Sequence, residues 1–294
     1  MVEKGKIKET NSEEGSSLSW FQLATKEFTK FITNQKVEIY WALKYLNMKN
    51  IKFGLLFVVF LASSFVIIKN ISAQESPFAG KVIALDAGHG GTELGATYPP
   101  NSGNAGIVKE KDVNLAVVYT LKTKIEEAGG KVVLTRVCDE TISGRKERVD
   151  WAVTQCKALT GRKCDALISV HHNGNVDATH DGTMVIYNEN QDKPLAIALH
   201  NSLIKALQLP DEGYDNGGYG MTVYNHLVSA LTEAFYITNE QEAQTYLNGT
   251  MKAVCSQGGL DYSVLIGDRV NKEAEALFQG LYTYLSTPTK PGRK

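Results

Sequence analysis

The chain has 294 residues, of which 43% are hydrophobic and 21% are charged, and its formal net charge is -1. This composition is typical of a globular protein with one large domain or two small ones. Ten of the 31 basic and six of the 32 acidic residues lie in positions 1–73, so the remainder has 21 basic and 26 acidic residues and a net charge of -5. A mildly acidic body offers no electrostatic basis for binding nucleic acid, so we expect no nucleic-acid partner.

The most apolar segment is residues 53–68, FGLLFVVFLASSFVII, which carries no charge. It is shorter than the roughly 18 to 20 residues of a membrane span. A basic flank precedes it and the small-residue sequence ISA follows it, as in a secretory signal. We therefore predict that residues 48–73 are a signal peptide cleaved after Ala73 or, as the alternative, a membrane anchor through 53–68. Because Met48 opens an ordinary signal, residues 1–47 are interpreted as a wrongly assigned start or as a cytosolic tail of an anchored protein.

From Pro77 onward, apolar runs alternate with stretches of helical periodicity. The alternation predicts an α/β fold: a single domain over 79–286 with a mostly parallel central sheet and helices on both faces, followed by a disordered tail over 287–294. Strands are expected at Val82–Leu85, Val132–Thr135, Ala166–Val170, Thr183–Tyr187 and Ser229–Leu231. Helices are expected within 110–130, 144–156, 194–207 and 271–285. Residues 210–220, PDEGYDNGGYG, are rich in glycine and acid and are expected to form an exposed loop.

The expected exported part contains four cysteines, Cys138, Cys156, Cys164 and Cys255. An even number fits two disulfides in a chain that leaves the cytosol. The first expected pair is Cys156 with Cys164, which flank KALTGRK, and this leaves Cys138 with Cys255. Four free buried thiols are the alternative.

Reactive side chains are expected at the carboxyl ends of strands, where ligand sites of open α/β sheets collect. His89 follows the first strand in DAGHGG, His171 and His172 end the third in SVHHNG, and Glu233 ends the strand in SALTE. Glu110 begins the helix after the first strand's long loop and can face the same edge. Two histidines and a carboxylate are a common catalytic zinc set, and a further carboxylate beside the metal suits a hydrolase.

Each of these residues also has a structural interpretation. The glycines around His89 need no function to form a turn, and Glu110 suits a solvated helix start. One of the two adjacent histidines must point to the opposite face of its strand. Glu233 is harder to explain structurally, because a carboxylate in the apolar context SALTEAFYI is costly to bury unless it is paired.

Six segments occur in a recognisable order: IALDAGHGGTELGA, GIVKEKDVNLAV, VVLTRVCDETISGRKERVDWA, LISVHHNG, GTMVIY and ALTEAFYITN. In this order they resemble the zinc-dependent N-acetylmuramoyl-L-alanine amidases of the Amidase_3 type, over about Lys81 to Leu285. The resemblance implies a peptidoglycan hydrolase that cleaves the amide bond between the lactyl group of N-acetylmuramic acid and L-alanine of the stem peptide. It also implies a periplasmic, extracellular or cell-wall location.

The resemblance implies roles for four residues. Zn2+ is expected to be held by His89, Glu110 and His171, and to activate the water that attacks the amide. Glu233 is expected to take the proton from that water and deliver it to the departing amine. Some relatives carry an inserted helix that plugs the zinc site until an activator removes it. Here only NENQDK separates the Tyr187 strand from the next helix, so we expect an open site that needs no activator protein.

Two other functions remain open from the sequence. A zinc peptidase acting within the stem peptide would use the same four residues, and only product analysis separates it from an amidase. A non-catalytic wall-binding relative has no need of a general base such as Glu233.

Four more polar residues have two interpretations each. Asp86 and Asn173 could orient a histidine or the substrate, with structural capping as the alternative. Arg136 and Arg148 suit the carboxylates of a stem peptide, with a structural ion pair as the alternative.

Overall fold

The computed structural model describes residues 75–142, 144–218 and 220–287. The predictions for residues 1–47 and 48–73, and for all but the first residue of the tail 287–294, lie outside the described residues. The described residues belong to a compact unit that begins at Glu75. Within these ranges, no helix has both the length and the apolar character needed to cross a membrane.

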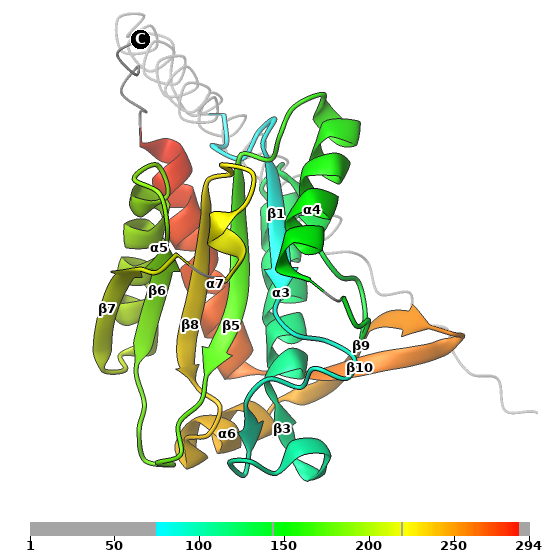
Figure 1. Cartoon of the computed structure of the whole chain (residues 1–294), viewed down its shortest axis with the longest axis vertical. Helices are drawn as coiled ribbons and strands as arrows, with labels where there is room; N and C mark the ends of the chain where they lie inside the picture. The colour runs from blue at the N-terminus through cyan, green and yellow to red at the C-terminus, as the bar shows by residue number, and fades with distance from the viewer. Residues whose placement is uncertain (1–74, 143, 219, 288–294) are drawn as a thin grey trace, which may run out of the picture. The chain divides into compact units, whose positions relative to one another are not determined.

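A six-stranded sheet forms the centre of this unit (Figure 1). In spatial order its strands are β4 (Lys131–Leu134), β1 (Val82–Ala87), β5 (Ala166–Asn173), β8 (Ser229–Tyr236), β6 (Thr183–Tyr187) and β7 (Asp211–Asn216). Strands β4, β1, β5 and β8 are mutually parallel, β6 is antiparallel to β8, and β7 is parallel to β6. The predicted mostly parallel sheet is confirmed, and the carboxyl ends of β1, β5 and β8 lie at one edge.

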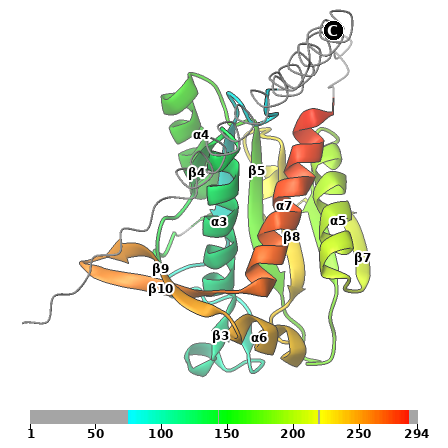
Figure 2. The same ribbon diagram turned by 180° about the vertical axis from the view of Figure 1, so that it is seen from behind.

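Helices cover both faces of the sheet, as predicted (Figures 1 and 2). One face is covered by α3 (Glu110–Glu127), α5 (Lys193–Leu207) and α7 (Asp268–Ser286), and the other by α4 (Arg145–Thr160). Strand β1 shows why, because all six of its residues are buried. Ile83 and Leu85 join the core beneath α3, α5 and α7, whereas Val82 and Ala84 join the core beneath α4. Alternate side chains of a strand serve opposite faces, so a doubly covered strand is apolar throughout.

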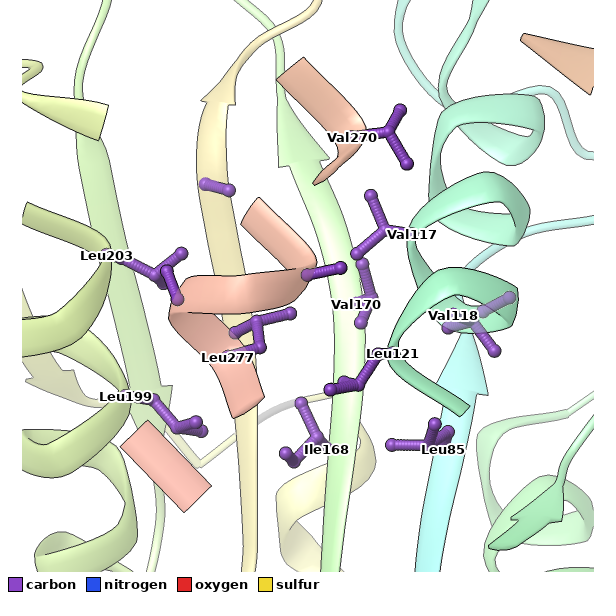
Figure 3. Close-up of a cluster of buried hydrophobic side chains, with 14 of the residues drawn as sticks. Leu85, Val117, Val118, Leu121, Ile168, Val170, Leu199, Leu203, Val270 and Leu277 are labelled. Carbon is purple, nitrogen blue, oxygen red and sulfur yellow. The ribbon is translucent and has the colours of Figure 1, made fainter. Parts of the chain in front are cut away.

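The larger core fixes the helix that starts at the candidate site. Leu121 of α3, Leu277 of α7 and Ile168 of β5 are all fully buried in this core (Figure 3). Burying one such side chain contributes about 1.5–3 kcal/mol relative to leaving it exposed. Helix α3 is therefore a rigid element, and its first residue, Glu110, has a fixed position.

Smaller elements surround the sheet. They are the ribbon β2 (Thr97–Tyr98) and β3 (Val108–Lys109), the short helices η1 (Gly103–Ala105), η2 (Gly220–Val223) and α6 (Glu240–Leu247), and the hairpin β9 (Thr250–Gln257) and β10 (Leu260–Ile266). The hairpin extends beside α3 (Figure 2), where the Tyr262 hydroxyl donates to Asp112. The sequence patterns predicted neither the ribbon nor the hairpin.

Both predicted disulfides are present. Cys138 is joined to Cys255 over a sequence separation of 117, and Cys156 to Cys164 over a separation of 8. The alternative of four free thiols is therefore wrong. The longer link ties the hairpin to the loop between β4 and α4.

One loop prediction is wrong, and three strands are longer than predicted, because β1 ends at Ala87, β5 at Asn173 and β8 at Tyr236. Residues 210–220 are not simply a loop, because Asp211–Asn216 forms β7 at the edge of the sheet. This strand is largely exposed and pairs with β6 alone, so no apolar alternation marks it in the sequence. The strand predicted to end at Leu231 continues to Tyr236, so Glu233 lies within β8 and not at its end.

Candidate metal centre

His89 lies in the turn after β1, at a backbone φ of 60°. Residues other than glycine rarely adopt this left-handed conformation, and the strain it stores is common at ligand sites. The turn is held in place because Gly88 N–H donates to the Val170 carbonyl at 3.0 Å and Arg148 Nη2 donates to the His89 carbonyl at 2.6 Å. A Cβ on Gly88 would lie 2.3 Å from the His171 ring, so only glycine allows this close approach.

Glu110 is buried, so its interpretation as a solvated helix-start charge is wrong. Its Oε2 accepts a hydrogen bond from Ala96 N–H at 2.8 Å. Its Oε1 accepts from His172 N–H at 3.1 Å and from Asn114 Nδ2 at 3.3 Å. The carboxylate is therefore fixed in orientation by three donors from three different segments.

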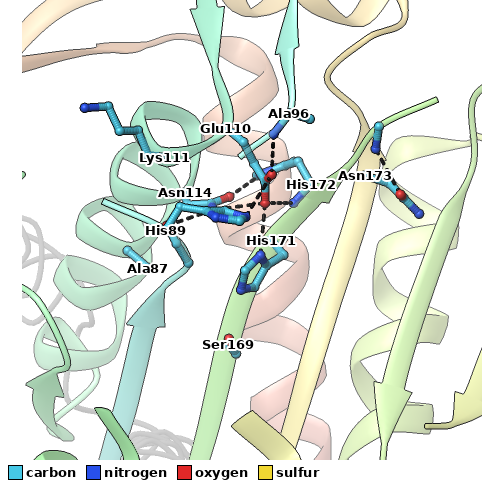
Figure 4. Close-up of polar contacts among 12 residues, drawn as sticks. Ala87, His89, Ala96, Glu110, Lys111, Asn114, Ser169, His171, His172 and Asn173 are labelled. Atoms are coloured by element: carbon cyan, nitrogen blue, oxygen red, sulfur yellow. Dashed lines mark hydrogen bonds and ion pairs between the residues drawn. The ribbon is translucent and has the colours of Figure 1, made fainter. Parts of the chain in front are cut away.

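The structure brings the three predicted ligands together (Figure 4). His89 Nε2 lies 3.1 Å from Glu110 Oε2, and His171 Nδ1 lies 3.0 Å from Glu110 Oε1. One ligand atom from each residue lies within 4.8 Å of the others. Burial alone would raise the pKa of Glu110, but hydrogen bonds and charges from His171 and His89 hold it well below its usual range. The cluster thus pairs an ionised carboxylate with two imidazoles, a donor set that suits zinc.

Glu233 lies beside this cluster because β8 pairs in parallel with β5, which places Glu233 opposite His171. Its Oε2 is buried and has no hydrogen-bond partner in the described part of the chain. Burial raises the pKa of Glu233 well above its usual range, and the negative charge of Glu110 raises it further. Two neighbouring carboxyl groups with pKa values shifted in opposite directions are a typical arrangement for a ligand and a proton carrier.

His172 points away from the cluster, as strand alternation predicts. Its side chain is buried, with Nδ1 2.6 Å from Asn114 Oδ1 and Nε2 2.9 Å from Glu273 Oε2. Its ring also packs on Phe235, with centroids 4.3 Å apart. The interpretation of His172 as a polar neighbour and not a ligand agrees with this geometry.

Asp86 and Arg148 form a buried ion pair, with Arg148 Nη1 3.0 Å from Asp86 Oδ1. Asp86 Oδ2 also accepts from Ser169 Oγ at 2.6 Å, and the Thr135 hydroxyl donates to Oδ1. Burial alone would raise the pKa of Asp86, but Arg148 and these hydroxyls lower it below the usual value. The ion-pair interpretation of Arg148 is correct, and Asp86 braces the base of the site through it.

Arg136 and Asn173 have structural contacts. Arg136 is buried and donates to four backbone carbonyls, those of Ala87, Gly88, Lys111 and Cys138. It therefore clamps the segments that carry the site and forms no ion pair within the described ranges. Asn173 Oδ1 accepts a hydrogen bond from Gly174 N–H at 2.9 Å. This contact agrees with the interpretation of Asn173 as a structural cap.

Two buried polar residues near the site were not predicted: Asn114, which contacts Glu110, and Glu273, which contacts His172. Asn114 lies one helical turn after Glu110 on the buried face of α3, so a polar residue at an apolar position was the available signal. Glu273 lies on the buried face of α7 with Val270 and Leu277, so a charged residue at an apolar position of the helix was the available signal here as well.

Two open clefts meet at the cluster. One, of about 580 Å3, contains Glu93, Arg145 and Tyr224 in its wall, and the other, of about 630 Å3, contains Asn101 and Asn175. His89, His171 and Glu233 line both clefts. The connection between β6 and α5 spans only residues 188–192, and none of these lines either cleft.

Residues 83–259, more than half of the chain, match the family described as N-acetylmuramoyl-L-alanine amidase, Amidase_3. The chain belongs to this family. The amidase family resemblance stated from the sequence segments is confirmed.

Three curated proteins illustrate the similarity of this Amidase_3 protein to its relatives. It is 31% identical over 171 residues to the uncharacterized protein YqiI of Bacillus subtilis, covering 57% of this chain and 75% of YqiI. It is 28% identical over 214 residues to N-acetylmuramoyl-L-alanine amidase LytC of Bacillus subtilis, covering 69% of this chain and 40% of LytC. It is 26% identical over 196 residues to the probable cell wall amidase LytH of Staphylococcus epidermidis, covering 65% of this chain and 62% of LytH. The match therefore spans less than two thirds of LytC and of LytH.

Solved amidase structures share the fold. The N-acetylmuramoyl-L-alanine amidase of Clostridium difficile 630 has a TM-score of 0.56 at 22% identity, covering 72% of this chain and 100% of that one. The catalytic domain of CwlV from Bacillus (Paenibacillus) polymyxa var. colistinus has a TM-score of 0.55 at 24% identity, covering 70% and 98%.

Proposed function

We propose that this Amidase_3 protein hydrolyses peptidoglycan at the amide bond between the lactyl group of N-acetylmuramic acid and L-alanine of the stem peptide. Membership of the Amidase_3 family supports both the hydrolase activity and this amide as the bond that is cleaved. The observation that carries the proposal at the level of residues is the His89, Glu110 and His171 cluster, with Glu233 lining the same clefts as the two histidines.

The cluster fits a zinc ion. Its three donor atoms converge within 4.8 Å, its carboxylate is ionised, and both histidines remain partly accessible from the clefts. We propose that His89, Glu110 and His171 hold Zn2+, which supplies Lewis-acid chemistry by polarising the scissile carbonyl and making water a better nucleophile. Ala96, Asn114 and His172 hold the Glu110 carboxylate by hydrogen bonds, so this ligand needs little reorganisation.

Glu233 is proposed as the general base and then the general acid. Glu233 lines both clefts, so its carboxyl group can accept the proton of the attacking water, and its raised pKa suits a group that then holds this proton. The same carboxyl group then donates that proton to the departing amine of alanine. Removing such a group costs roughly 10²- to 10⁴-fold in rate.

We further propose that the site acts without an activator protein and outside the cytosol. The short β6–α5 connection supports the first point, because it provides no segment to cover the clefts. The two disulfides support the second point, since disulfides persist in oxidising compartments. Residues 48–73 are proposed as the signal peptide or anchor that directs export.

The test is to incubate the purified protein with zinc on peptidoglycan and to identify the products by mass spectrometry, beside Glu233→Ala. Glu240→Ala is the control, because Glu240 is an exposed carboxylate that lines neither cleft. We expect stem peptides that begin with L-alanine from the wild type and from Glu240→Ala, and their release by Glu233→Ala to be slower by roughly 10²- to 10⁴-fold. Shortened stem peptides would indicate a peptidase. Intact peptidoglycan at every zinc concentration would indicate a binding protein and refute the proposal.

A further inference from the structure

A buried chain of three polar side chains lies behind the metal centre. Asn114 of α3, His172 of β5 and Glu273 of α7 are almost completely inaccessible to solvent, with exposed fractions of 0%, 1% and 0%. His172 Nδ1 lies 2.6 Å from Asn114 Oδ1, and His172 Nε2 lies 2.9 Å from Glu273 Oε2. Burying three such groups opposes folding unless their hydrogen bonds compensate, so we expect these three side chains to have a function.

Asn114 contacts the segments that carry all three candidate ligands. Asn114 Nδ2 donates to the carbonyl of Gly88, the residue before His89, at 3.1 Å. The same nitrogen donates to Glu110 Oε1 at 3.3 Å. Asn114 Oδ1 contacts His172, the residue after His171. One amide therefore connects the His89 turn, the Glu110 carboxylate and the strand of His171.

The orientation of this amide is determined by its neighbours. The Gly88 carbonyl oxygen near Asn114 Nδ2 can only accept a hydrogen bond, so the NH2 group must face it and the neighbouring Glu110 carboxyl oxygen. Asn114 Oδ1 then faces His172 and must accept a hydrogen bond from the Nδ1–H group of that ring. A histidine with its proton on Nε2 alone would place two lone pairs against each other and would release the amide.

Glu273 supplies the partner for the other nitrogen of His172. A proton between Nε2 and Glu273 Oε2 completes the hydrogen bond while Nδ1 keeps its own proton. Glu273 Oε1 has no hydrogen-bond partner among the described residues, so the contact with His172 accounts for the position of this carboxyl group. Glu273 also lies beyond residues 83–259, the segment that matches the family.

We propose that Glu273 is a positioning residue which acts through His172 and Asn114 to hold the three metal-binding side chains in their arrangement. The inference rests on the proposed function only in taking His89, Glu110 and His171 as zinc ligands. Partners that orient a ligand in this indirect way typically change metal affinity by roughly 10- to 100-fold when they are removed.

The test measures zinc affinity of the full-length protein by competition with a chromogenic chelator, which requires no substrate. Glu273→Met removes the partner of His172, and we expect it to weaken zinc binding roughly 10- to 100-fold. Glu273→Gln should restore affinity to the wild-type value, because its amide N–H can donate to His172 Nε2 and leave the proton on Nδ1. Glu242→Met is the matched control, since Glu242 is another buried glutamate, paired with Arg269 at 2.5 Å and without a hydrogen bond to the three-residue chain.

Each outcome decides between the proposals. Weakened binding in Glu273→Met but not in Glu242→Met or Glu273→Gln supports the positioning role. Equal affinity in all four proteins, or an equal loss in both methionine variants, overturns it while leaving the proposed function intact. A wild type that binds no zinc overturns the proposed function, and this inference with it.

A second measurement covers the case in which Glu273→Met does not fold. Nitrogen NMR of the wild-type imidazoles reports which ring nitrogen of His172 carries a proton. We expect a protonated Nδ1 in the wild type and in Glu273→Gln. A bare Nδ1 in the wild type would overturn the inference without any destabilised variant.

Discussion

The two disulfides differ in the length of chain that they close, and this difference predicts unequal contributions to stability. Cys138–Cys255 spans a sequence separation of 117, whereas Cys156–Cys164 spans only 8. If a disulfide acts mainly by restricting the unfolded chain, its contribution grows with the logarithm of the loop length. That relation gives about 4.9 kcal/mol for the long loop and about 2.5 kcal/mol for the short one.

The perturbation is to replace each pair by alanine, one pair at a time. Alanine is preferable to serine because Cys138, Cys156 and Cys164 are buried, and a hydroxyl there would add the cost of a polar group. Each variant is unfolded in guanidinium chloride without reductant and followed by far-UV circular dichroism. The free energies of unfolding are compared with that of the wild type.

We expect the Cys138/Cys255 variant to lose about 2.4 kcal/mol more than the Cys156/Cys164 variant. The short pair is the internal reference, because both replacements remove one disulfide between buried or partly buried cysteines and differ chiefly in loop length. Equal losses, or a larger loss for the short pair, would refute the loop-closure reasoning for this domain. Native contacts of the bridges, not the freedom of the unfolded chain, would then set their contribution.

Three further predictions concern the surroundings of the site. Gly88→Ala places a Cβ 2.3 Å from the His171 ring, so we expect a loss of zinc affinity and roughly 10²-fold in kcat; wild-type affinity by chelator competition would contradict this. Arg148→Leu leaves Asp86 buried without its partner and should cost about 3–5 kcal/mol of unfolding free energy. Because the pKa of Asp86 is lowered, the loss should be full above pH 3.8 and shrink in acid, and a loss independent of pH would refute the assignment. Burial raises the pKa of Glu242 from 4.5 to about 7, so the folded state binds the Glu242 proton more tightly than the unfolded state does. The contribution of this proton to the free energy of unfolding is therefore lost as the pH rises between those two values. Glu242→Gln should flatten this part of the curve of stability against pH, and an unchanged slope would count against the raised pKa.

The four candidate site residues were predictable because reactive groups in an α/β sheet collect where parallel strands end. His89, Glu110 and His171 meet as that rule implies, although Glu233 lies inside β8 and not at its end. The apolar runs predicted the strands that are buried on both faces, because such strands must be apolar throughout. These central strands could be located from the sequence because they are buried on both faces.

Three strands that the sequence did not predict, β7, β9 and β10, lack a one-sided burial pattern. Strand β7 is an exposed edge, and hairpin β9–β10 is exposed over most of its length, so neither shows apolar alternation. Glu273 contacts His172 from 101 residues away, a distance over which local periodicity carries no information. Its role depends on how α7 packs, which only the three-dimensional structure provides.

The strand order also has a consequence for how the protein folds. Strand β8 lies between β5 and β6, which precede it in the chain and are separated from each other in the sheet. Neither the parallel pairing of β5 with β8 nor the antiparallel pairing of β6 with β8 can form until β8 has been synthesised and inserted. Such non-local pairing is slow relative to helix formation. The same insertion places Glu233 opposite His171, so a partly folded chain in which β8 is not yet paired lacks the proposed proton acceptor beside the three-ligand cluster.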